Sequence, residues 1–389
     1  MTNIDKNVRF LGLNSFFTDI STEMILPLLP IFLDKFLQVS KADIGLIEGL
    51  AEFSAAILIA LSGFYSDKIG ARKNIALFGY SLSNLTKPLM LFANSFVFVM
   101  FVRIMDRVGK GIRTAPRDAL IASYSDKSNS GKSFGFHKMM DSGGALVGSL
   151  AAFGVLVYFS ENENAFRIIF ALSLIPGILA FVTLAFFVKD ATIKHNINIE
   201  FFSNLKLLGA DFYRFVAFQT LFALVAMNYS FYILKAEHNG FSISMIPLVY
   251  ALYNIAQSLP ALKIGSLSDR YGKRTMLLFA YFSFCTAALF FMSNTLWGIW
   301  AGFAFYGLFA ANFSSMSKAI IADMVETDKK ATAYGVYFSS IGLATFISLF
   351  VAGIIWDKFG ADTLFELSFT ISSLLLFIAV SIKIKKLFS

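Results

Sequence analysis

Twelve apolar segments, each long enough to cross a lipid bilayer, run through the 389-residue chain. A spanning helix needs roughly 20 mainly apolar residues. The segments lie near residues 8–33, 42–65, 74–93, 96–121, 133–159, 165–188, 211–234, 242–268, 274–293, 296–321, 331–355 and 362–384. They are continuous runs, unlike the alternating stretches typical of a membrane β-barrel. We therefore predict an all-α membrane protein with twelve transmembrane helices.

The basic residues outside these segments are unevenly distributed. The N-terminus, the connections after even-numbered helices and the C-terminus hold 18 Lys and Arg, and the other connections hold about four. By the positive-inside rule, both termini are expected in the cytoplasm and the protein in the cytoplasmic membrane. Topology thus explains the net charge of +8, and no nucleic-acid partner is expected. The first segment is too long for a signal-peptide core and is expected to remain in the mature protein.

Two internal matches predict a duplicated architecture. GFYSDKIGARK at 63–73 and GSLSDRYGKR at 265–274 share the pattern G-x-x-x-D-[KR]-x-G with an offset of 202 residues. Residues 119–135 likewise match residues 319–335 with an offset of 200. We predict two pseudo-symmetric six-helix bundles, related as parallel repeats. The N-terminal bundle is placed at 1–188, a cytoplasmic linker at 189–210 and the C-terminal bundle at 211–389.

With these features the chain resembles a major facilitator superfamily transporter, because the motif lies in the predicted turn between helices two and three and recurs in the second half. The resemblance implies alternating access, with this loop holding the cytoplasmic side closed. It assigns gating to Gly63, Asp67, Lys68, Gly70, Arg72, Lys73, Gly265, Asp269, Arg270 and Gly272. Arg117 and Asp118, near the inner end of helix four, are added to this group. The alternative is that the motif only stabilises a tight turn.

The stretch RIMDRVGKGIRTAPRD, residues 103–118, carries seven charges. On a regular helix all seven fall within an arc of about 140°. A lipid-facing charge at mid-bilayer costs at least ~2.5–3.5 kcal/mol, so the arc is expected to face a wet interior. We predict solute binding by Arg103, Arg107, Lys110 and Arg113 and a proton-coupling role for Asp106. The alternatives are a cytoplasmic extension of the helix, or structural ion pairs of Asp106 with Arg103 and Asp118 with Arg107.

Other titratable groups of the first half are expected on the same interior. Asp19 and Glu23 share an arc of helix one with Ser15 and Thr22. His137 and Asp141 lie four residues apart on helix five, on the face that carries Gly144 and Gly148. Helix two adds Glu48 and Glu52. We predict proton coupling by Asp19, Glu23, His137 and Asp141.

The second half contributes mainly neutral polar and aromatic groups. Predicted solute contacts there are Asn228, Tyr253, Asn254, Gln257 and Tyr337. The alternative is that these side chains only join helices to one another.

Together these features predict a proton-coupled secondary transporter for a polar, anionic or zwitterionic organic solute. The Arg103-to-Gly111 stretch is similar to the superfamily's helix-four Arg motif, which is associated with proton coupling. Two alternatives stay open: a drug or siderophore efflux antiporter, and a receptor with a transporter fold. Ser149 stands where the family's antiporter signature has proline, which weakens the drug antiporter alternative. The solute's identity and the direction of transport are not specified.

An enzyme is not expected. DKSNSGKS at 126–133 lacks the first glycine of a phosphate-binding loop, and it has no preceding strand. With one cysteine, Cys285, neither a disulfide framework nor a cysteine metal site is predicted. We expect no cofactor and no metal, and a monomer whose partners are a small solute, protons and membrane lipid.

Overall fold

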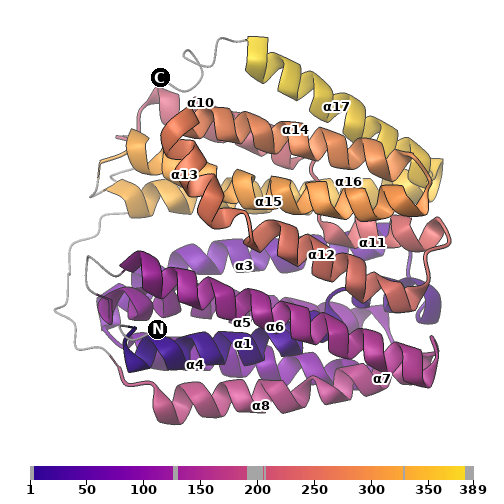
Figure 1. Cartoon of the computed structure of the whole chain (residues 1–389), viewed down its shortest axis with the longest axis horizontal. Coiled ribbons are helices and arrows are strands. Elements are labelled where there is room, and N and C mark those ends of the chain that lie inside the picture. Colours follow the sequence, from indigo (N-terminus) through magenta and orange to yellow (C-terminus); the bar gives the residue numbers. More distant parts are fainter. Residues whose placement is uncertain (1–3, 126–129, 191–204, 206, 327–328, 382–389) are drawn as a thin grey trace. The chain divides into compact units, whose positions relative to one another are not determined.

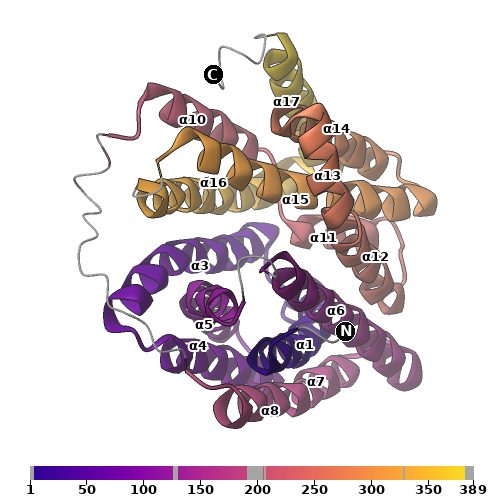
Figure 2. The same ribbon diagram turned by 60° about the vertical axis from the view of Figure 1, so that its left-hand side comes forward.

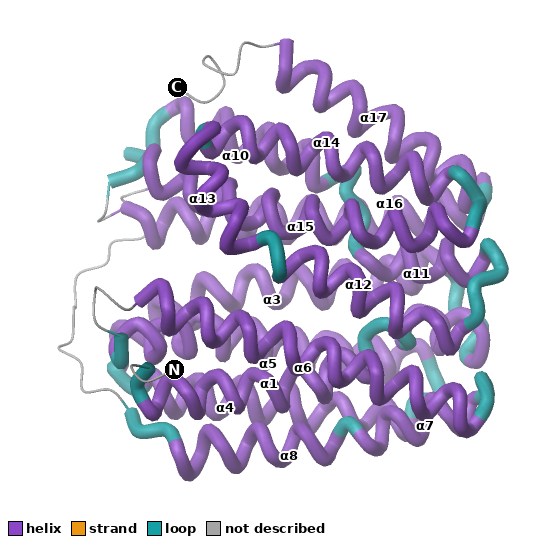
Figure 3. Tube along the Cα trace, in the orientation of Figure 1, coloured by secondary structure: helices purple, strands orange, loops and turns teal. Residues whose placement is uncertain are grey.

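A computed structural model describes residues 4–125, 130–190, 205, 207–326 and 329–381. Within these residues the chain consists of helices joined by loops, with no strand (Figure 3). Two compact units are present. The first comprises Met1–Val39, Leu50–Ile199 and Ile243–Ala251, and the second comprises Ser40–Gly49, Glu200–Ser242 and Leu252–Ser389. The bundle boundaries expected from the sequence stay a prediction.

Six predicted segments account for the helices up to residue 187 (Figure 1). These helices are α1 (Lys6–Ile25), α2 (Leu29–Ile31), η1 (Phe32–Phe36), α3 (Lys41–Ile69), α4 (Arg72–Thr86), η2 (Lys87–Phe92), α5 (Phe96–Ser123), α6 (Ser130–Phe159), α7 (Glu163–Leu172), α8 (Leu174–Val182) and η3 (Thr183–Phe187). Within the first unit α5 is surrounded by α1, α3, α4 and α6, as Figure 2 shows.

The other six segments form the helices after the linker. They are α10 (Ala210–Ala223), α11 (Tyr229–His238), η4 (Ile243–Met245), α12 (Ile246–Ser258), α13 (Ala261–Tyr271), α14 (Lys273–Met292), α15 (Leu296–Met324), α16 (Lys330–Phe359) and α17 (Ala361–Ser381). The predicted linker at 189–210 falls mostly outside the described residues.

The helix bounds repeat along the chain. α5 and α15 begin at Phe96 and Leu296, and α6 and α16 begin at Ser130 and Lys330, both 200 residues apart. Even the caps correspond: the side chain of Ser95 accepts a hydrogen bond from the third residue of α5, and Thr295 does the same for α15. Such caps satisfy amide groups that have no partner inside the helix. Each position in α5 and α6 therefore has an equivalent in α15 and α16.

Eight helical stretches of the described part are long and apolar enough to cross a membrane. The segments outside this set are α4 with η2, α5, α10 with α11, and α12 with α13. α5 carries many charges, α4 continues directly into η2, and the other two segments are interrupted, after Ala223 and after Ser258. The protein is a multi-pass membrane protein with twelve helical segments in two bundles.

The segment expected as one helix over 211–234 is broken, which corrects that prediction. α10 ends at Ala223 and α11 starts at Tyr229, where the side chain of Asn228 accepts a hydrogen bond from the amide of Ser230. The break leaves backbone carbonyls without helical partners. Tyr306 donates to the carbonyl of Met227 at 3.0 Å, and Ser368 donates to that of Val225 at 3.2 Å. An interruption at membrane depth requires such internal partners.

The turn motif ends α3 and α13 with a glycine in the left-handed region. Gly70 has φ 73° and Gly272 has φ 90°. Side chains with a Cβ rarely adopt this conformation, which explains the glycine at the end of both motifs.

Glycines also set the spacing between helices of the first unit. A Cβ on Gly109 of α5 would lie 2.6 Å from the carbonyl oxygen of Gly79 on α4. A Cβ on Gly148 of α6 would lie 2.6 Å from the carbonyl oxygen of Ile20 on α1, and Gly144 is equally close to Phe16. The close packing that small residues permit at Gly144 and Gly148 occurs against α1.

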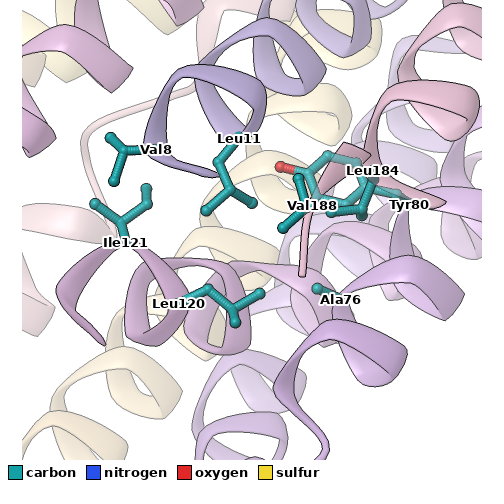
Figure 4. Close-up of a cluster of buried hydrophobic side chains, with 8 residues drawn as sticks. All are labelled: Val8, Leu11, Ala76, Tyr80, Leu120, Ile121, Leu184 and Val188. Carbon is teal, nitrogen blue, oxygen red and sulfur yellow. The ribbon is translucent and has the colours of Figure 1, made fainter. Parts of the chain in front are cut away.

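An apolar cluster closes one end of the first unit. It consists of Val8, Leu11, Ala76, Tyr80, Leu120, Ile121, Leu184 and Val188 (Figure 4). These side chains come from α1, α4, α5 and the end of η3. Tyr80 belongs to this cluster through its ring, whereas its hydroxyl has polar neighbours.

Candidate functional site

The charged stretch lies within α5, and its deeper charges are buried in the first unit. Arg103, Asp106, Arg107 and Arg113 are each at most 6% exposed, whereas Val97 and Phe101, on the opposite side of the helix, are more than half exposed. Lys110 lies on the charged side and is itself exposed. Four charges are thus buried within the first unit, whereas Lys110 on the same face is exposed.

Arg103 and Arg107 are held by carboxylates from within the unit. Arg103 binds Asp106 at 3.1 Å, and Asp106 also accepts a 2.6 Å hydrogen bond from Ser83 of α4. Arg107 binds Glu52 of α3 at 2.6 Å. Buried charges require such partners because leaving water is costly.

One of the two alternative ion pairs considered from the sequence is present and the other is not. Arg103 pairs with Asp106, whereas Asp118 pairs with Arg117 at 2.8 Å. Arg107 is eleven residues from Asp118, roughly 16 Å along a helix, so the two side chains cannot meet.

Arg113 is a buried cation with spare hydrogen-bonding capacity. Its guanidinium carbon lies 4.5 Å from the ring centre of Tyr80, in a cation–π arrangement. Its Nε and Nη1 are buried and have no hydrogen-bond partner among the described residues. A buried guanidinium with unused donors is suited to a planar anion such as a carboxylate.

A chain of polar contacts leads from Tyr80 to helix α6. Ser15 Oγ lies 3.2 Å from the Tyr80 hydroxyl and 2.7 Å from Nε2 of His137. Nδ1 of His137 is 3.7 Å from a carboxylate oxygen of Asp141, whose Oδ1 is buried without a partner among the described residues. Arg113, Tyr80, Ser15, His137 and Asp141 therefore form one connected group, called the histidine chain below.

Asp19 and Glu23 lie close to this group on α1. Asp19 interacts electrostatically with Asp141, Glu23 and Arg113. The structure thus brings together the predicted proton-coupling carboxylates of α1 and α6 near the guanidinium of Arg113.

A second group surrounds Lys87, the first residue of η2. Its Nζ donates to Thr22 of α1 at 2.8 Å, and the side chain is buried. A small pocket adjoins it, lined by Thr22, Ile25, Leu26, Leu29, Lys87, Met90, Val102, Arg103 and Asp106. Lys87 places an amine in the same pocket as the Arg103–Asp106 pair.

The predicted second-unit residues are more dispersed. The ring of Tyr253 stacks on Tyr306 with centroids 5.2 Å apart, and Asn228 caps α11. Tyr337 is buried and its hydroxyl interacts with Ser317. Asn254 and Gln257 are partly buried on α12.

The predicted gating residues have local roles where they are described. In the first unit, Arg72 donates to the carbonyl of Ala119 and Lys73 to that of Ala185, so both tie the start of α4 to neighbouring helices. The surroundings of Asp67, Lys68 and Gly265 fall outside the described part.

In the second unit Asp269 and Arg270 are exposed. Nearby, Lys273 binds Asp323 of α15 at 2.6 Å. The motif of each unit is thus followed by basic residues that contact the helices beside it.

Sequence reasoning missed Tyr80, Ser83 and Lys87 of the segment at 74–93. Their spacing of three and four residues is a helical face, and a lysine inside an apolar segment is itself unusual. This signal was sufficient to find the face of α4 that contacts α5. In the described residues no group of three His, Cys, Asp or Glu side chains is arranged to hold a metal ion.

Comparison with known proteins yields one family. The sequence profile of the Major Facilitator Superfamily matches residues 11–234 and 215–386. An uncharacterized MFS-type transporter of Methanocaldococcus jannaschii is 33% identical over 364 residues, covering 91% of this chain and 89% of that protein. The quinolone resistance protein NorA of Staphylococcus aureus is 25% identical over 187 residues, 48% of this chain and 46% of NorA. The crystal structure of a mutant of the nucleoside transporter NupG superposes with a TM-score of 0.83 at 15% identity, covering 96% of this chain and 99% of that one.

Proposed function

Since the chain belongs to the major facilitator superfamily and is a membrane transporter rather than an enzyme, we propose that it carries a small organic anion or zwitterion by proton-coupled alternating access. The basic residues of the sequence support an orientation in the cytoplasmic membrane with both termini inside. The protein acts as a monomer in this proposal.

The observation that carries the proposal is the buried guanidinium of Arg113 with unused Nε and Nη1 donors. A buried charge without a hydrogen-bonded counter-charge is destabilising. A carboxylate-bearing solute supplies the missing acceptors, whereas a neutral apolar solute does not. Arg103 and Arg107 already have carboxylate partners, so they form the positive surroundings of the site.

Proton coupling is supported by the carboxylates around the same guanidinium. Asp19, Glu23 and Asp141 interact within one unit, and His137 contacts Asp141. Titratable side chains inside a transmembrane bundle are the groups that relay protons in membrane transporters, and this proposal assigns that role to the cluster. A proton bound by these side chains offsets the negative charge of an anionic solute, and its release accompanies the departure of that solute.

Solute discrimination by the second unit remains part of this proposal. Tyr253, Asn254, Gln257 and Tyr337 offer aromatic and hydrogen-bonding groups, and Asn228 carries a buried Nδ2 without a partner among the described residues. Such groups suit the uncharged part of an organic solute.

Uptake into proteoliposomes tests the function. We expect citrate, glucuronate or a related carboxylate to accumulate along an imposed pH gradient, and a protonophore to abolish that accumulation. Norfloxacin, a quinolone, and a neutral sugar serve as comparison solutes, with protein-free liposomes as the control. Both gradient directions are imposed, which separates symport from antiport.

Three other results would contradict the proposal. Accumulation of norfloxacin without any carboxylate supports the drug efflux alternative, for which the partial similarity to NorA is the specific observation. A carboxylate that raises the melting temperature but never accumulates in either gradient supports a receptor. Carboxylate uptake that is indifferent to the pH gradient removes the proton from the mechanism.

A further inference from the structure

A buried tyrosine occupies the same helical position in both units. Tyr80 is the ninth residue of α4 and Tyr281 the ninth of α14. Each hydroxyl contacts the tenth residue of the first helix of its own unit: Tyr80 meets Ser15 of α1 at 3.2 Å, and Tyr281 donates to Gln219 of α10 at 2.9 Å. The two units thus share one packing arrangement around a tyrosine.

The residues around the two tyrosines differ in charge. Arg113, the eighteenth residue of α5, stacks on Tyr80, whereas its equivalent Phe313 lies 6.4 Å from the ring centre of Tyr281. His137, the eighth residue of α6, corresponds to the buried Tyr337 of α16.

Four residues further along α6, Asp141 has an isoleucine as its equivalent, Ile341. The second unit therefore packs this arrangement with neutral side chains. Because burying charges opposes folding, the charged version in the first unit is not explained by helix packing.

The contacts of Ser15 make the two sides of the histidine chain dependent on each other. A serine hydroxyl has one proton to donate. When neutral His137 carries its proton on Nδ1, the nitrogen that faces Asp141, Ser15 donates to Nε2 and can accept from Tyr80. When a second proton binds at Nε2, Nε2 donates to Ser15, whose own proton then turns towards Tyr80. From this tautomer, protonation of His137 reverses the hydrogen bond to the Tyr80 hydroxyl, whose ring lies against Arg113.

We propose that Ser15 and Tyr80 are positioning residues that couple protonation of His137 to the anion-binding guanidinium of Arg113. This inference rests on the proposed function and specifies how its proton and its anion are linked. By thermodynamic reciprocity, if protonation of His137 changes the free energy of anion binding at Arg113, then anion binding at Arg113 changes the proton affinity of His137 by the same free energy. The neutral group around Tyr281 has no such linkage.

Direct charge interactions are the rival explanation, and they act on His137 from α5 and from its own helix. Arg117 and Asp118 face it from α5, and Lys138 and Asp141 lie beside it on α6. From α1, Asp19 acts on Asp141. A direct effect of Arg113 does not need the Tyr80 hydroxyl, so removing that hydroxyl separates the two explanations.

The test is the titration of His137, followed by NMR in the purified, histidine-labelled full chain. The chain has three histidines, and His137→Asn identifies the signal. Tyr80→Phe and Tyr281→Phe form a matched pair, each removing one hydroxyl from a buried ring. We expect Tyr80→Phe to shift the titration midpoint by about half a pH unit or more, and Tyr281→Phe to leave it unchanged.

A double-mutant cycle then measures the coupling. Arg113→Phe, which installs the residue of the second unit, is expected to shift the His137 midpoint in the wild-type background and to have less than half that effect in the Tyr80→Phe background. If Arg113→Phe does not fold, Arg113→Lys takes its place, because it keeps the charge and removes the planar group stacked on the ring. If the relay operates, Arg113→Lys shifts the titration midpoint of His137. If only the charge of residue 113 acts on His137, Arg113→Lys leaves that midpoint unchanged.

An equal effect of Arg113 substitution in both tyrosine backgrounds would overturn the inference, as would a shift in Tyr281→Phe as large as that in Tyr80→Phe. The measurement requires no solute. A failed relay is therefore seen in the NMR titration, whereas a failed transport function is seen in proteoliposomes.

Discussion

Replacing Arg113 by Gln is expected to weaken carboxylate uptake about 10- to 100-fold, because a hydrogen bond to a charged group is worth ~1.5–3 kcal/mol. The guanidinium is buried, stacked on Tyr80, and has two donor atoms without partners among the described residues. Gln keeps a polar side chain but removes the charge and the planar fork. The concentration dependence of uptake in proteoliposomes gives the change in apparent affinity.

The matched control is Arg214→Gln. The side chain of Arg214 is 63% exposed and pairs with Asp211 one helical turn away, an arrangement that contributes little. It is expected to transport like the wild type. Unchanged affinity in a folded Arg113→Gln protein would show that the guanidinium does not bind the solute.

Replacing Gly109 by Ala is expected to destabilise the first unit by about 1–3 kcal/mol or more through overpacking. The added Cβ would lie 2.6 Å from the carbonyl oxygen of Gly79 and 2.7 Å from the amide nitrogen of Ser83. Both are backbone atoms, so α4 and α5 must move apart. Because Ser83 donates to Asp106, this movement also disturbs the charged face. Thermal unfolding in detergent measures the loss as a lowered melting temperature.

Gly154→Ala provides the comparison on another helix of the same unit. A Cβ there meets no atom within 4 Å, and alanine favours a helix more than glycine does. Its melting temperature is expected to equal or exceed that of the wild type. If both variants melt alike, the close contact between Gly79 and Gly109 does not limit the packing.

Several features of the fold were accessible from the sequence because each has a local or periodic signal. Apolar length predicted the helical segments, and the repeated turn motif predicted the duplication seen in the bounds of α5, α6, α15 and α16. Helical periodicity placed the charges of α5 on one face, and four of them are buried in the structure. Their roles in binding and coupling remain predictions.

Other features depend on partners that the sequence does not pair. The break between α10 and α11 contains neither Pro nor Gly, and it is supported by hydroxyls of Tyr306 and Ser368 from distant helices. Similarly, Glu52 rather than Asp118 binds Arg107, because the nearest carboxylate in space belongs to α3. A polar residue in an apolar segment is recognisable in advance, whereas its partner is set by packing.

The order of the buried partners along the chain bears on membrane insertion during synthesis. An isolated α5 would expose several charges to lipid, each costing roughly 2.5–3.5 kcal/mol near the bilayer centre. The carboxylate of Glu52 and the hydroxyl of Ser83 belong to helices that leave the ribosome before α5 does. We therefore expect stable insertion of α5 to require α3 and α4, which precede it along the chain and supply these partners.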